Sequence, residues 1–294
     1  MEFPRIIEII DFATPIYVVL IFLEMAMSLR HNKQYYEAKD SLINVFFSVL
    51  NLGLAFFVRM ACLGFLYFFF QFHIFEISYP IFYWLCLFLL QDMAFYFQHR
   101  VDHYCRFFWA VHVTHHSSEY FNLTTGFRSS VFQPLYWFVY FIPLVLLGFK
   151  PLDIMLMYAI TQIYGILIHT QFIAKMGFLE YFMSTPSHHR VHHASNIQYL
   201  DKNMGMVLII WDKLFGTFQQ EEDTEPVRFG LTKKIPKPND PLQGIFHEWK
   251  AIGQDLRRDL PLKIRLKYVF KPPGWSHDGS TKTSKELRED CVKK

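Results

Sequence analysis

The sequence predicts an all-α integral membrane protein, with four to five membrane helices and a helical, histidine-rich metal-binding cap. Three observations support this fold class. The 294 residues are 52% hydrophobic and include 33 Phe, while charged residues make up only 19%. Several apolar runs approach the roughly 20 residues that a helix needs to cross a bilayer. Finally, nine of the 14 histidines fall in two short stretches that follow apolar runs, HRVDHYCRFFWAVHVTHH and SHHRVHH.

Five apolar segments are candidates for membrane helices: residues 12–29, 43–70, 80–97, 132–147 and 152–168. The second segment contains Arg59, which we expect to face protein or the interface because a charged side chain is costly in lipid. The fourth and fifth segments are slightly short and are joined by GFKP. They form either two complete spans or a hairpin that enters the membrane only partway.

The distribution of Lys and Arg predicts the topology. Basic residues occur in the first loop, after the third segment and throughout the tail, whereas residues 71–80 contain none. The positive-inside rule therefore places both histidine stretches and the tail in the cytosol, and the N-terminus outside. The membrane is either a bacterial inner membrane or the endoplasmic reticulum. We divide the chain into an N-terminal transmembrane region (1–90), a histidine-box domain (91–218) and a polar cytosolic tail (219–294), within which 242–260 could form an amphipathic helix. The last stretch, from Ser276, we expect to be weakly ordered.

The histidines repeat at helical spacings. Residues three and four positions apart share one face of a helix, so each of three boxes, HxxxH, HxxHH and HxxHH, presents its imidazoles together. The eight box histidines are His99, His103, His112, His115, His116, His189, His192 and His193. Neutral imidazole binds Fe, Zn, Cu and Ni, and eight ligands exceed the requirement of one ion. The boxes therefore predict a site for two metal ions.

Further residues are candidates for supporting roles. His169 could be a ninth ligand or a helix cap, and His188 lies off the face of its box. Some polar residues near the boxes could accept hydrogen bonds from the ligands and fix their tautomers. They are Asp92, Asp102, Glu119, Asn122, Asn196, Asp201 and Asn203, of which Asp102, Glu119 and Asn196 are the candidates we select.

Other classes of function have little support. A net charge of +3 does not indicate nucleic-acid binding. The sequence has no GxGxxG motif, Walker loop or CxxCH haem site, so we expect electrons to come from an external donor.

The boxes, together with TPSHHRVHH and the DKN…LIIWD…FGTF segment, resemble the fatty acid hydroxylase/sterol desaturase superfamily, from about Asp40 to Phe218. Within it, the chain is most similar to the alkylglycerol monooxygenases. The resemblance implies a di-iron centre on the cytosolic face, held by the eight box histidines and His169. It also implies hydroxylation of a membrane lipid by O2, with ether-lipid cleavage and sterol or fatty-acyl hydroxylation as the options and tetrahydrobiopterin as a candidate electron donor.

Two alternatives remain open at this point. The same di-iron centre could desaturate a lipid or sterol, because a second hydrogen abstraction then replaces oxygen transfer. The protein could also be a non-catalytic membrane metal-binding protein, which would favour polar residues along the spans. The segments offer few of these beyond Arg59, Asp92 and Gln162.

Overall fold

The computed structural model describes residues 3–235 and 240–292, with side chains described from residue 11 to residue 291 outside that gap. The described part of the chain is helical and contains no β-strand. The N-terminal helices are α1 (Phe3–Arg30), α2 (Ala38–Phe70), α3 (Pro80–Tyr104) and α4 (Arg106–His116). The others are α5 (Ile142–Leu146), α6 (Pro151–Leu167), α7 (Pro186–His192), α8 (Ile210–Phe215), α9 (Pro241–Leu256), α10 (Leu262–Phe270) and α11 (Ser284–Val292). The predicted fold class is therefore correct.

Three helices are long and apolar enough to cross a membrane, namely α1 from Asp11, α2 and α3. The start of α2 is fixed by Glu37, whose carboxylate accepts a hydrogen bond from the backbone N–H of Asp40 at 2.6 Å. Pro80 begins α3, where its missing N–H costs no helical hydrogen bond. Many large apolar side chains on these helices are exposed, as lipid contact requires.

The fourth predicted segment is not one helix. Residues 132–147 form two 3-10 turns, Gln133–Leu135 and Trp137–Phe141, followed by the single helical turn of α5. Pro134 and Pro143 interrupt the regular pattern because proline has no N–H to donate. The fifth segment does form a helix, α6, of 17 residues. Of the four to five predicted membrane helices, three thus have the length of a span in the described residues.

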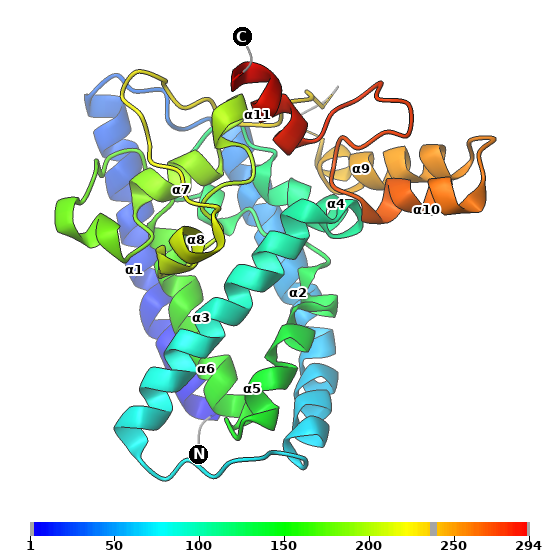
Figure 1. Cartoon of the computed structure of the whole chain (residues 1–294). Coiled ribbons are helices and arrows are strands. Elements are labelled where there is room, and N and C mark those ends of the chain that lie inside the picture. The colour runs from blue at the N-terminus through cyan, green and yellow to red at the C-terminus, as the bar shows by residue number, and fades with distance from the viewer. Residues whose placement is uncertain (1–2, 236–239, 293–294) are drawn as a thin grey trace.

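The short α5 and α6 pack between the long helices. Their buried side chains meet those of α2 and α3 in one hydrophobic cluster, which includes Leu66, Leu87, Val145 and Ile154. Figure 1 shows the start of α1 and the α2–α3 connection at one end of the bundle, and α4, α7 and α11 at the other. Both histidine stretches therefore lie at the same end.

The tail packs against this histidine-bearing end. Arg106, the first residue of α4, donates to Glu248 and Asp255 of α9, each at 2.6 Å. The predicted helix over 242–260 corresponds to α9. The expectation of weak order after Ser276 is wrong for residues 284–292, which form α11, where Arg288 donates to the carbonyl oxygen of Leu200.

Candidate metal centre

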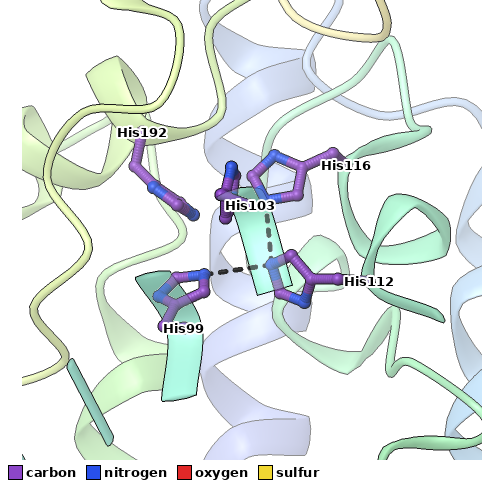
Figure 2. Close-up of side chains that lie close together, drawn as sticks. All are labelled: His99, His103, His112, His116 and His192. Atoms are coloured by element: carbon purple, nitrogen blue, oxygen red, sulfur yellow. Dashed lines mark hydrogen bonds between the residues drawn. The ribbon is translucent and has the colours of Figure 1, made fainter. Parts of the chain in front are cut away.

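Nine buried or nearly buried histidines form two neighbouring groups. The five-histidine cluster comprises His99, His103, His112, His116 and His192. The four-histidine cluster comprises His115, His169, His189 and His193. Within each group, one nitrogen from every side chain lies within 4.8 Å of the others. Figure 2 shows the five-histidine cluster, whose rings converge from different segments on one point. All nine predicted ligands are thus brought together by the fold, including His169.

Local helix geometry explains how these side chains meet. His99 and His103 are one turn apart at the end of α3, and the extended backbone of Cys105 separates α3 from α4. The box on α4 supplies side chains to both clusters, since His112 and His116 point to one and His115 to the other. The box on α7 is divided in the same way. The two clusters therefore share α4 and the α7 box as their scaffold.

A short loop after α7 orients three rings of the five-histidine cluster. His99 Nδ1 donates to the carbonyl oxygen of Met204 at 2.8 Å, and His192 Nδ1 donates to that of Lys202 at 2.9 Å. His103 Nδ1 lies 3.2 Å from the carboxylate of Asp201. A carbonyl can only accept, so in a neutral imidazole Nε2 keeps its lone pair for a metal.

Positive backbone angles allow this loop to curl around the rings. Asp201 and Asn203 have φ of 53° and 54°, a region that Asp and Asn tolerate better than other residues with a Cβ. The Asn203 side chain donates to the carbonyl oxygens of His188 and Gln219, which holds the loop against α7. Asp212 fixes the end of the loop by accepting from the N–H of Met204 at 2.7 Å.

The four-histidine cluster is oriented by different backbone groups. His115 Nδ1 donates to the carbonyl oxygen of Arg128 at 3.0 Å, and His169 Nδ1 donates to that of Gly165 at 2.7 Å. His169 Nε2 is then unprotonated and faces His189 Nε2 at 2.8 Å. This close approach of nitrogen atoms is typical of side chains prepared to share one cation.

Arg128 is a supporting residue that the sequence analysis missed. Its guanidinium is fully buried and donates to the carbonyl oxygen of Thr114, to Ser117 and to Asn44, and it pairs with Asp40 at 3.3 Å. These contacts join α2 to the end of α4. A signal was present, because Arg128 is the only charged residue between Glu119 and Lys150.

Burial keeps the imidazoles outside the spans neutral. It lowers the pKa of His115 to about 4. Burial, followed by the repulsion of neighbouring imidazoles, lowers the pKa values of His112, His116, His192 and His193 well below the ordinary value. Neutral imidazole is the form that binds metal.

Several buried ring nitrogens have no hydrogen-bond partner among the described residues. They are Nε2 of His103, His192 and His193, and Nδ1 of His189. A buried polar atom without a partner is costly unless a ligand satisfies it. The donor set therefore fits metal ions, and both clusters could hold one.

Asp102, Glu119 and Asn196, which we expected to accept hydrogen bonds from the ligand histidines, contact other groups instead. Asp102 accepts from Tyr136 and Gln98, while Asn196 binds Glu225 and the backbone of Pro226 and Arg228. Glu119 lies 3.7 Å from Lys234. In the described part of the chain none of the three is hydrogen-bonded to a clustered histidine, whereas backbone carbonyls accept from His99, His115, His169 and His192.

Asp92 and His188 were also considered as supports for the ligand imidazoles. Both instead stabilise the backbone around α7. Asp92 accepts from the backbone N–H groups of Val207 and Leu208 and from Trp211, which fastens the segment after α7 to α3. His188 accepts from the backbone N–H of Thr185 at 3.3 Å and so caps the start of α7. Of the polar residues considered, Asp201 alone meets a clustered imidazole in the described chain.

Two cavities reach the clusters. A membrane-side cavity of about 310 Å³ extends between α2 and α6 to His99, His112, His115, His169 and His189. A cap-side cavity of about 840 Å³ reaches His103, His116, His192 and His193 from the side of α9. The centre is therefore accessible from the apolar bundle and from the polar cap.

Comparison with known proteins identifies relatives that act on lipids. Residues 84–217 match the family model described as Fatty acid hydroxylase. The chain is 35% identical to alkylglycerol monooxygenase of Homo sapiens over 93% of this chain and 62% of that protein. It is 31% identical to ornithine lipid hydroxylase OlsE of Rhizobium tropici, over 51% of this chain and 45% of that protein. The identity to lathosterol oxidase of Mus musculus is 27%, over 46% of this chain and 44% of that protein.

The chain spans about three fifths of the length of the alkylglycerol monooxygenases that it matches. No solved structure matches it.

Proposed function

We propose that this chain, whose residues 84–217 match the fatty acid hydroxylase family model, is a membrane-bound iron monooxygenase that uses O2 to hydroxylate a C–H bond of a lipid. The observation that carries the proposal is the position of the paired histidine clusters at the end of an apolar, membrane-side cavity. An aliphatic chain in this cavity would lie directly against the metal centre.

We assign one iron ion to each cluster, held by the eight box histidines and His169. Two iron ions in this neutral imidazole environment would supply the activation of O2 that an unreactive C–H bond requires. The electron donor is a separate molecule, and the histidine end of the bundle faces the cytosol.

The protein's own residues hold the ligands and position the lipid. Carbonyl oxygens of Met204, Lys202, Arg128 and Gly165 keep the imidazole lone pairs directed inward. Preorganised ligands lose little freedom when metal binds. Apolar side chains of α2 and α6 line the membrane-side cavity, so a lipid chain can enter while bulk water is excluded.

Isotope labelling tests the proposal. Cells that express the protein are grown under ¹⁸O2, and their lipids are compared by mass spectrometry with those of a His115→Ala variant. We expect a labelled hydroxyl or aldehyde only with the intact protein. His31→Ala is the matched control, because His31 is exposed and lies outside both clusters.

Two other outcomes of the labelling experiment would change the proposal. New double bonds without label would replace hydroxylation by desaturation. Full labelling in His115→Ala would contradict the assignment of the centre.

A further inference from the structure

Arg59 is an unpaired cation inside a membrane helix. It lies in α2 among apolar neighbours and lines the membrane-side cavity. Among the described residues it forms no ion pair or hydrogen bond. Ionisable groups at such positions usually face a cavity and take part in ligand binding, because exposure to lipid is unfavourable.

Helix geometry places Arg59 near the middle of the bilayer. At 1.5 Å per residue, Pro80 and His99 of α3 are about 28 Å apart, close to the thickness of the hydrocarbon layer. Arg59 precedes the end of α2 at Phe70 by eleven residues, which corresponds to about 16 Å. The backbone of Arg59 therefore lies near the mid-depth of a span, far from the water at either end.

The rest of the cavity wall offers no counter-charge. No Asp or Glu side chain is among the described residues that line it. Its other polar groups are neutral, and one of them, Gln162 on α6, has a buried Nε2 without a partner. The cavity thus presents one cation and a free amide donor, which complement an anion with several acceptor oxygens.

The distance from Arg59 to the centre limits how such an anion can bind. Asn51 donates to the carbonyl oxygen of Ser130 at 2.8 Å, and the Ser130 hydroxyl lies 3.4 Å from His112 Nδ1. Asn51 therefore marks the level of the clusters on α2. Arg59 is eight residues further along the helix, or about 12 Å away. A ligand anchored at Arg59 can reach the histidines only through an intervening chain.

We propose that the membrane-side cavity binds an amphiphile with an acidic group, a carboxylate or a phosphate monoester, on Arg59, and directs its alkyl chain towards the clusters. The inference rests on the proposed function in so far as this amphiphile is the substrate. The oxidised carbon is then several bonds away from the acidic group, and Arg59 determines substrate specificity.

A binding experiment that does not depend on turnover tests this inference. The iron-loaded protein in neutral detergent is kept anaerobic, and its affinities for dodecanoate, dodecyl phosphate and dodecanol are compared. Two charge-assisted hydrogen bonds should favour the acidic probes over the alcohol by roughly tenfold or more. The stronger acidic probe identifies the class of headgroup. We expect Arg59→Gln to remove the preference and Arg59→Lys to retain part of it.

The control is Arg257→Gln, which removes an exposed charge on the cap and should leave the preference intact. Equal affinity for acid and alcohol in the intact protein would overturn the inference, as would an unchanged preference in Arg59→Gln. If Arg59→Gln does not fold, the affinities of the intact protein and of Arg59→Lys for the acidic probes and the alcohol still test the inference. Acid preference without any ¹⁸O-labelled product would contradict the proposed function and leave the binding site standing. Labelled product without acid preference would support the proposed function and contradict the acidic binding site at Arg59.

Discussion

The two histidine clusters use the same side chain and the same outward hydrogen bond, but different parts of the fold orient them. The five-histidine cluster is held by the loop 201–204, whose Asp201 also lines the cap-side cavity. The four-histidine cluster is held by Arg128 and by Gly165 at the end of α6, on the membrane side. The rings that we propose as metal ligands are thus oriented both from the loop 201–204 and from the membrane bundle, so the supporting groups of each cluster can be disturbed separately.

Removal of a ligand from either cluster should have the largest effect. We expect His116→Ala and His193→Ala each to lower the iron content from about two ions per chain to about one and to reduce activity by more than about a hundredfold. Metal analysis of the purified variants, with His31→Ala as the control, checks this. Loss of both ions in each variant would mean that the clusters bind metal as a single unit.

Removal of Arg128 should come next. Arg128→Met leaves the buried Asp40 carboxylate without its partner, so we expect the protein to lose about 3–5 kcal/mol of stability. Thermal unfolding in detergent measures this loss. Adding Asp40→Asn removes the stranded charge and should restore part of the stability. No recovery in the double variant would contradict the ion-pair explanation.

Asp201 should matter only for the five-histidine cluster. Asp201→Asn keeps an acceptor for His103 and tolerates the positive φ, but it removes the negative charge that strengthens the imidazole as a ligand. We expect iron to dissociate about tenfold faster from this cluster, as measured by chelator competition. Asp223→Asn, at an exposed ion pair, is the control. Equal acceleration from both clusters would contradict the separate orientation of the two.

The smallest predicted effect concerns the four-histidine cluster. In Gly126→Ala the new methyl group would lie 3.1 Å from the Cα atom of Ile166 and 3.2 Å from His169 Nδ1. Both atoms must shift slightly, and we expect a cost of about 1 kcal/mol. Chelator competition should show faster iron loss from this cluster alone. An unchanged rate would mean that His169 is held less rigidly than its hydrogen bond suggests.

Much of the site was predictable because helical spacing is a local property. The helical spacing of the boxes that begin at His99, His112 and His189 can be read from the sequence. The three long helices could be predicted too, because each contains a long apolar run. The fourth segment was not predictable as turns, because its hydrophobicity resembles that of a helix and only Pro134 and Pro143 argue against one. Apolar composition responds to the environment of a segment more than to its backbone conformation.

The orienting partners could not be predicted from residue types. We expected carboxylates such as Asp102 to support the imidazoles, whereas most partners are carbonyl oxygens, such as those of Lys202 and Met204. Every residue has a carbonyl group, so the sequence does not distinguish the ones that meet a histidine. Asp201 was identifiable because its side chain itself accepts the bond.

The most direct test of the proposed monooxygenase activity is a single turnover under ¹⁸O2. Protein loaded with about two iron ions per chain is reduced chemically, mixed with a lipid extract and exposed to the labelled gas. We expect one ¹⁸O atom in a lipid product for each pair of iron ions, and none with His115→Ala. A fully loaded, reduced protein that leaves every lipid unlabelled would contradict it.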